Sequence, residues 1–468
     1  MPMNSTEVFK GERMRKVINL DDLLMWIKNI FSHAGIRRYG VNTAWLFAEQ
    51  ILRMIAGFLV GVWVARYLGP EKFGLFSYVL AFTSIFNGIT KLGLDSIVVR
   101  DLVKEPGKRN IYLGTAFRLK LFAGIITFVL VLITSWFTAN NIKVFLFINI
   151  ISFGFIFQSF EVIDFYYQAT VQAKYISIRR IIQLILSSGI NVILVLIKAE
   201  LIWFVCVNLF DFISLAIFSW SIYKAQNLPN FLKYVDWQIG KRLLKDSWPL
   251  ILSAIAVSVY MRIDQIMIKN MLGNKETGLY SAAVRIVEIW YFIPALITQS
   301  IFPAIVTAKK TSEEVYLDII KKLYSFMFFT ALGIVLLVLI FSKLIILVLF
   351  GIHFLAAAEP LKIMIFLIVF SFWGVPTSMW GISENLQRIG LERTVITAIL
   401  VVLFNFIFIP KYGLYGAAFG TILSQFIPGI VLNLLDRRTR KIAVIQLIAI
   451  IYPFLYFKNK IFGELHGK

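Results

Sequence analysis

Ionisable side chains lie inside long apolar stretches of this 468-residue chain, where a charge that faces hydrocarbon is costly and therefore marks a candidate site. Residues 43–65 contain Glu49 and Arg53, four positions apart in the order that favours an ion pair on one helical face. This pair either neutralises itself or serves a ligand. Glu49 is then a candidate ion-coupling group or charge partner, and Arg53 a candidate for binding an anion.

Two acids, Glu161 and Asp164, lie three positions apart in residues 144–171, on one helical face and with no basic residue near them in sequence. Two carboxylates this close favour the binding of a proton by one of them, which is what proton coupling requires. The alternative is that cations from another helix keep both carboxylates ionised. Asp211, in residues 201–222, is a further acid without an obvious partner.

The densest set of charges belongs to two neighbouring predicted helices, residues 248–270 and 279–305. The set comprises Arg262 and Asp264 on the first helix and Arg285 and Glu288 on the second. All four lie at a similar distance from the expected outer turn. They can meet across the hairpin and neutralise one another as a structural cluster. Alternatively, Arg262 or Arg285 faces a cavity and binds an anionic group, since the planar guanidinium fork suits phosphate.

The sequence lacks the residue patterns that are typical of enzyme active sites. The three histidines, His33, His353 and His466, are scattered, and the sequence contains no metal-ligand spacing, nucleophile elbow or phosphate-cradling glycine loop. No Walker motif supports ATP-driven work. We expect no cofactor, and we expect any energy to come from an H+ or Na+ gradient, the membrane potential or consumption of a product.

Composition places the chain in lipid, because 59% of its residues are hydrophobic and only 16% are charged. Its net charge of +21 follows the positive-inside rule once a cytoplasmic N-terminus is assumed, so we expect no nucleic-acid partner. Most Lys and Arg residues then fall in the tail and the inner loops. The opposite loops hold only Arg66, Lys72, Lys143, Lys198, Lys269, Lys275, Lys343, Lys362 and Lys411.

Hydropathy predicts an all-α integral membrane protein with about twelve transmembrane helices. The expected spans are 43–65, 73–97, 121–138, 144–171, 181–197, 201–222, 248–270, 279–305, 323–341, 363–383, 394–410 and 414–434. A further run, Ile442–Phe457, contains Pro453 and is either a short thirteenth span or a segment lying at the interface. The side of the C-terminus stays open.

An internal repeat indicates how the spans are organised. Residues Tyr67–Tyr78 and Met271–Ala282 share the pattern Leu-Gly-x4-Gly-Leu-x-Ser, and turn geometry is the simplest explanation of its glycines. We expect two six-helix lobes related by a parallel pseudo-two-fold repeat, V-shaped around a central cavity. The predicted parts are a basic cytoplasmic tail, the N-terminal lobe, a cytoplasmic linker, the C-terminal lobe and a C-terminal segment, at 1–41, 42–222, 223–247, 248–441 and 442–468.

Several sequence blocks occur together in one order between about residues 40 and 440. They include LGPEKFGLFSY, LGLDSIVVRDL, DFYYQATVQAKYISIRR, RIDQIMIKNMLGNKETGLYSAAVRIVE and YGLYGAAFGTILSQ. With these blocks the chain resembles bacterial polysaccharide flippases of the Wzx (O-antigen) type. That family belongs to a superfamily that also holds multidrug-extrusion antiporters and lipid II flippases.

The resemblance implies a function in surface polysaccharide or lipopolysaccharide biosynthesis at the bacterial cytoplasmic (inner) membrane. The implied activity moves undecaprenyl-pyrophosphate-linked oligosaccharide from the inner to the outer leaflet by alternating access around a cationic cavity. A polysaccharide polymerase and a chain-length regulator are the implied protein partners. The family motifs fall on Arg262, Asp264, Arg285 and Glu288.

Two other functions remain open at this point. A multidrug or small-solute cation antiporter would use an acidic cavity built from Glu161, Asp164 and Asp211. A membrane-embedded glycan polymerase or ligase would handle the same lipid-linked substrate, but such enzymes generally need a large outer loop. The longest outer connection here, around Ser342–Lys362, is short and mostly apolar. We therefore favour transport.

Overall fold

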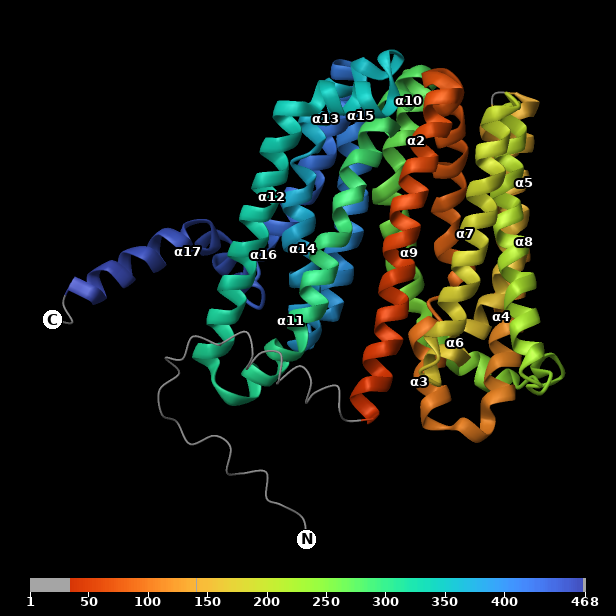
Figure 1. The fold of residues 1–468 in the computed structure, drawn as a ribbon, viewed down its shortest axis with the longest axis horizontal. Coiled ribbons are helices and arrows are strands. Elements are labelled where there is room, and N and C mark those ends of the chain that lie inside the picture. Colours follow the sequence, from red (N-terminus) through yellow and green to blue (C-terminus); the bar gives the residue numbers. More distant parts are fainter. Residues whose placement is uncertain (1–33, 140, 466–468) are drawn as a thin grey trace, which may run out of the picture.

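The computed structural model describes residues 34–139 and 141–465, and every regular element within these ranges is a helix (Figure 1). Nine helices of this part are long and apolar enough to cross a membrane, or ten if the bent pair Ile352–Met364 and Leu367–Ser383 forms one span. The prediction of an all-α membrane protein is therefore confirmed. Of the expected tail at 1–41, residues 1–33 lie outside the described ranges.

In each half of the chain, two helical segments that were expected to be separate spans are joined through a glycine and share one label. Helix α2 (Ala34–Lys91) bends at Gly69, whose φ is 68°, and α15 (Gln387–Phe426) bends at Gly413, whose φ is 57°. Both φ values lie in the left-handed region, which glycine adopts without a steric penalty. Each bent helix is long enough for two crossings, so the structure is compatible with twelve spans, a number that stays a prediction.

The first half consists of α2 to α8. After α2 its α-helices are α3 (Asp95–Lys104), α4 (Arg109–Thr138), α5 (Ile142–Phe153), α6 (Val162–Ala169), α7 (Ala173–Leu196) and α8 (Leu201–Ala225). Its 3-10 helices are η1 (Pro106–Lys108) and η2 (Gly154–Glu161). Because η2 joins α5 to α6 without a break, these three elements together form one membrane-length unit, Ile142–Ala169.

The second half consists of α9 to α17. Its α-helices are α9 (Trp237–Met271), α10 (Asn274–Glu288), α11 (Phe292–Thr311), α12 (Glu313–Phe350), α13 (Ala358–Met364), α14 (Leu367–Ser383), α15, α16 (Leu432–Leu435) and α17 (Arg440–Leu465). The elements η4 (Ile289–Tyr291) and η5 (Ile352–Ala357) are 3-10 helices, and η6 (Ile427–Val431) is a π-helix. Figure 1 shows α4 to α8 on one side of the bundle and α11 to α16 on the other, with α2, α9 and α10 between them.

The two copies of the repeat pack against each other where α2 turns at Gly69 and α10 begins. We call this the Gly69 end; it lies at the top of Figure 1. A Cβ at Gly74 would lie 2.6 Å from the backbone nitrogen of Gly278, and one at Gly278 would collide with the carbonyl of Pro70. Turn geometry thus explains Gly69 and Gly273, whose φ values are 68° and 108°, whereas the second glycine of each copy permits close contact between the halves.

The linker between the halves is fixed to the first half. Its 3-10 helix η3 (Phe231–Lys233) lies on α4, where Arg118 donates to the carbonyl of Leu232 at 3.3 Å. The backbone nitrogen of Asp236 donates to the hydroxyl of Thr115 at 3.0 Å, and Asp236 then caps α9. Helix α9 therefore starts from a point anchored on the first half.

Helix α9 belongs to both halves. Near its start Arg242 pairs with Asp101 of α3 at 3.1 Å, and a Cβ at Gly88 of α2 would lie 2.7 Å from the backbone nitrogen of Ile255. Near its end Asp264 binds side chains of α15. The boundary predicted at residue 248 thus falls inside a helix that packs on each half in turn.

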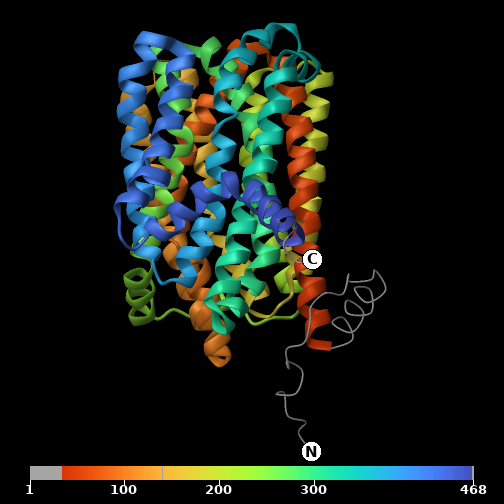
Figure 2. The ribbon, with the colours of Figure 1, turned by 90° about the vertical axis from the view of Figure 1, so that its left-hand side faces the viewer.

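Helix α17 covers the run Ile442–Phe457, which was predicted to be either a short thirteenth span or a segment at the interface. It starts with the buried residues Ile442 and Ala443 and packs on α12. Figure 2 shows it lying across one face of the bundle, and Figure 1 shows it leaving the bundle at that side. Its direction thus differs from that of the long helices, and both interpretations of this run stay predictions.

Candidate functional site

A buried carboxylate lies at the centre of the second half. Asp264 of α9 is 6% exposed and accepts hydrogen bonds from the hydroxyls of Tyr280 at 2.7 Å and Thr421 at 2.9 Å. Its other oxygen accepts from the amide of Asn405 at 2.8 Å. The bend at Gly413 folds α15 back on itself, which brings Asn405 and Thr421 to the same carboxylate. Sequence analysis identified Asp264 but none of these three partners.

Arg262 lies two positions before Asp264 and faces another way. Successive helical residues are rotated by about 100°, so residues two apart lie on nearly opposite faces. Arg262 instead pairs with Glu288 of α10 at 3.0 Å, and about a third of each side chain is exposed. The expected meeting of four charges across the hairpin therefore does not form: one ion pair does, while Asp264 and Arg285 each point elsewhere.

Arg285 lies between the two halves without a counter-ion. Its guanidinium packs directly on Gly61 of α2 and lies 5.3 Å from the ring centroid of Phe73, also in α2. It makes no hydrogen bond or ion pair with any residue that the structure describes. Gly61 allows this approach, because a Cβ there would collide with the guanidinium. Arg285 is therefore the candidate cation that remains available to a ligand.

The first half holds a network of five charged side chains. Glu49 pairs with Arg53 at 3.1 Å, as the sequence predicted, and lies 3.7 Å from Arg180. Asp164 pairs with Arg180 at 3.1 Å and with Arg179 at 2.6 Å, and Arg179 also donates to Ser219. The network joins α2, α6, α7 and α8, and three cations face two acids. The side chain of Arg53 is 47% exposed.

The acids Glu161 and Asp164 do not share a proton-binding site in this conformation. Glu161 pairs at 2.8 Å with Lys120, which is fully buried on α4 and also lies over the ring of Phe165. Each acid thus has a cation from another helix, which was the alternative to proton coupling. Asp211 also has a partner, because the amide of Gln183 donates to it at 2.6 Å.

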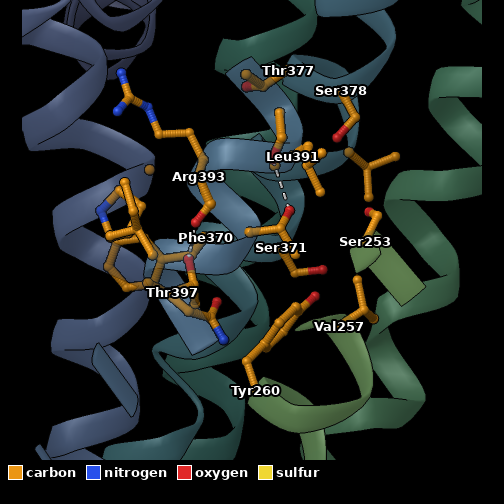
Figure 3. A pocket seen from close by; sticks show the side chains of 18 of the residues that line it. Ser253, Val257, Tyr260, Phe370, Ser371, Thr377, Ser378, Leu391, Arg393 and Thr397 are labelled. Carbon is orange, nitrogen blue, oxygen red and sulfur yellow. Dashed lines mark hydrogen bonds between the residues drawn. The ribbon is translucent and has the colours of Figure 1, made fainter. Parts of the chain in front are cut away.

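A cavity of about 1460 Å³ opens inside the second half (Figure 3). Ser253 and Tyr260 of α9 face Ser371 and Ser378 of α14 across it, and Arg393 of α15 also lines it. Asp264 and Glu288 reach its wall, together with the large aromatic side chains Trp373 and Trp380. All of its lining residues follow residue 247, so this cavity lies within one half. The expected cavity between the halves stays a prediction.

Sequence reasoning missed the side chains that hold the acids in place. Asn405 and Thr421 are single polar residues in apolar runs, a signal that was visible but shared with many packing residues. Lys120 is also a charge within an expected span and could have been named on that ground. Among the described residues, no group of three or more His, Cys, Asp or Glu side chains could hold a metal ion.

Comparison with known proteins identifies relatives along most of the chain. Residues 40–309 match the model of a family described as polysaccharide biosynthesis protein. The capsular polysaccharide biosynthesis protein CapF of Staphylococcus aureus is 24% identical over 399 residues, covering 82% of this chain and 96% of that protein. A putative O-antigen transporter of Shigella flexneri is 23% identical over 419 residues, covering 85% and 97%.

Solved structures share the fold. An inward-facing multidrug resistance MATE transporter of the MOP superfamily has a TM-score of 0.64 at 15% identity, covering 84% of this chain and 95% of that one. The lipid II flippase MurJ, in an inward closed conformation, has a TM-score of 0.64 at 14% identity, covering 89% and 98%. At these identities the likeness shows the fold alone.

Proposed function

This chain belongs to the polysaccharide biosynthesis protein family and is a membrane transporter of the polysaccharide or O-antigen class, and from that premise we propose that its cargo is an undecaprenyl-pyrophosphate-linked oligosaccharide. The protein moves this cargo from the inner to the outer leaflet of a bacterial cytoplasmic membrane by alternating access. The N-terminus lies in the cytoplasm, and the Gly69 end faces outward. A polysaccharide polymerase and a chain-length regulator act on or beside the product.

The observation that carries this proposal is the free guanidinium of Arg285 between the two halves. A diphosphate cannot cross hydrocarbon unaided, and an unpaired cation at the junction of two moving bodies is placed to hold it. Arginine donates two parallel hydrogen bonds to phosphate oxygens. The polyprenyl tail stays in the bilayer throughout.

Arg262 and Arg53 serve the same cargo at different stages. Arg262 is held by Glu288 at 3.0 Å, so binding a phosphate there requires it to release that carboxylate. Arg53 is likewise paired with Glu49 at 3.1 Å, but about half of its side chain is exposed, so an anion can approach it from solvent. We assign Arg53 to the approach of the anionic group and Arg285 to its retention.

We assign ion coupling to Asp264. Its carboxylate is buried with the hydroxyl of Thr421, and the side-chain oxygen of Asn405 nearby is buried without any hydrogen-bond partner. A carboxylate, a hydroxyl and an orphaned amide oxygen are the ligand types that a hard cation such as Na+ prefers. A proton on the carboxylate is the other candidate. Either ion would offset the cost of burying the charge.

The proposal is tested with purified protein in proteoliposomes, comparing the host's own lipid-linked glycan with bare undecaprenyl pyrophosphate. Protein-dependent movement of the glycan-linked lipid, stimulated by a sodium or proton gradient, is the expected result. If neither lipid moves, the flippase function is wrong.

The two other functions are less well supported by the geometry. A cation antiporter needs free acids, but Glu161 and Asp164 are each paired with Lys or Arg, and Asp211 accepts a hydrogen bond from the amide of Gln183. A polymerase or ligase needs an outer loop for chemistry, but residues 342–362 are taken up by the end of α12, by η5 and by α13. Both observations favour transport of an anionic lipid-linked glycan.

A further inference from the structure

Two cations that flank the second repeat copy lie against aromatic rings of the first copy. Besides Arg285 over Phe73, the ammonium of Lys269 in α9 lies 4.6 Å from the ring centroid of Tyr78 in α2. Lys269 was placed by sequence in an outer loop, which is wrong: it is 7% exposed, within the packed end of α9. Both cations belong to the second half and both rings to the first.

Lys269 has no counter-ion in this conformation. Its one hydrogen bond, at 3.4 Å, goes to the side chain of its neighbour Asn270, and no described carboxylate lies within ion-pair distance. A buried, unpaired ammonium is costly, and a cation–π contact offsets only about 2 kcal/mol of that cost. The closed Gly69 end therefore covers a charge that gains free energy when it is uncovered or meets an anion.

The repeat itself shows that packing does not require these cations. In the register of the two copies, Lys269 corresponds to Ala65 and Arg285 to Ala81, and both alanines are buried. The first copy thus fills the equivalent places with small apolar side chains and packs equally closely. The second copy alone has acquired charge at both positions, which indicates a role other than stability.

Lys269 is buried against Tyr78 of α2, so parting of the halves at the Gly69 end uncovers its ammonium. We propose that Lys269 is a second pyrophosphate-binding cation, separate from Arg285, that is exposed only when the Gly69 end opens. The rings that the two cations contact are five residues apart in α2 and so point about 140° apart around its axis, which places the two cations on different sides of that helix. This inference rests on the proposed function in taking the cargo's pyrophosphate as the ligand.

Lys269 supplies a direction to the transport cycle. Its ammonium becomes available to an anion only once the Gly69 end has opened. An anion bound by Lys269 holds the Gly69 end apart, because closing would return an unpaired ammonium to the interior. Lys269 is a positioning residue for release of the cargo.

The test measures opening of the Gly69 end directly. In a Cys206→Ser background, Glu71→Cys and Asn274→Cys replace two side chains that are hydrogen bonded at 3.2 Å between α2 and α10. Protein in nanodiscs is treated with a short thiol cross-linker at increasing inorganic pyrophosphate. We expect pyrophosphate to lower cross-linking in this background, in Lys269→Arg and in Lys275→Met, which removes an exposed lysine at the same end.

In the absence of pyrophosphate, we expect the Lys269→Met variant to cross-link at least as efficiently as the Cys206→Ser background. This result would also show that the variant folds and closes. The pyrophosphate concentration needed for opening should rise about tenfold, the loss expected for one charge-assisted hydrogen bond. An unchanged response in Lys269→Met, or no response in the background, overturns the inference. If the response is present but glycan-linked lipid is not moved in proteoliposomes, the anion site at Lys269 stands and the proposed function fails.

Discussion

At the scale of single residues, helical geometry separates charges that look alike in the sequence. Arg262 and Asp264 are two positions apart, yet Arg262 pairs with Glu288 on α10 while Asp264 is enclosed by hydroxyl and amide groups of α10 and α15. Arg285 is left without an acid. Removing each of these side chains should therefore have a different effect.

Arg285→Ala should lower translocation of the lipid-linked glycan by roughly 10- to 100-fold, the range expected for charge-assisted hydrogen bonds to a phosphate. Expression and thermal stability should be unchanged, because no described carboxylate depends on this side chain. Proteoliposome flux and thermal unfolding of the same preparations provide the two readouts. Wild-type flux in this variant would remove Arg285 from the site.

Arg262→Ala should instead destabilise the protein, by about 1–3 kcal/mol, because Glu288 keeps a charge without its partner. The double variant Arg262→Met with Glu288→Met removes both charges and should recover most of that loss. Thermal unfolding of the single and double variants, combined as a double-mutant cycle, measures the coupling between the two side chains. A double variant as unstable as the sum of the single ones would show that the pair is not coupled.

Asp264→Asn should abolish the stimulation of transport by an ion gradient while preserving most of the hydrogen bonds around the side chain. Asparagine has nearly the same shape but cannot balance the charge of a cation or take up a proton. Flux with and without sodium and pH gradients distinguishes the two ions. The matched control is Asp211→Asn, a second acid within a span, bonded to Gln183 in the other half; retained gradient dependence in Asp264→Asn would contradict the assignment.

At the scale of helices, most elements could be predicted from apolar length, and their ends could not. The glycines at 69 and 413 were visible, and each interrupts the helical backbone between two segments that were expected as separate spans. The sequence does not show which side chains pack together, because this depends on how the helices are rotated about their axes. Lys120 and Glu161, for example, are 41 positions apart, and they meet only because α4 and η2 turn these two faces toward each other.

Gly278→Ala should force the Gly69 end apart, because its methyl group would collide with the carbonyl of Pro70. Overpacking of this kind costs about 1–3 kcal/mol, seen as a lower unfolding temperature and weaker cross-linking between positions 71 and 274. Gly57→Ala is the control in α2, since a Cβ there meets nothing within 4 Å. Equal behaviour of the two variants would show that the contact does not hold the halves together.

At the scale of the whole molecule, the family and the transporter class could be predicted from the blocks of sequence. Which buried charges are neutralised by a partner could not be predicted in this way. Three acids looked free for a cationic cargo, yet the fold supplies Lys120, Arg179 and Arg180 to two of them and Gln183 to Asp211. Arg285 and Lys269, by contrast, have no counter-ion among the residues that the structure describes. This difference is the basis for proposing an anionic cargo.

Expression of the protein in cells that lack their own efflux pumps should leave the accumulation of a fluorescent organic cation unchanged. The physical reason is that the three acids of the antiporter hypothesis already have partners, which are Lys120, Arg179 and Gln183. Cellular fluorescence with and without expression is the measurement, and a variant with Arg285→Ala serves as a further comparison. Reduced accumulation that depends on the protein would favour the antiporter.

The bending of helix α9 would report the movement of the two halves. One end is tied to α3 and α4 through Arg242 and the capped linker, and the other end is tied to α15 through Asp264. In the proposed transport cycle, a movement of one half against the other would therefore bend this helix between Ile255 and Asp264. The distance between two spectroscopic labels at the exposed Lys241 and Met271, both in α9, would report that bending.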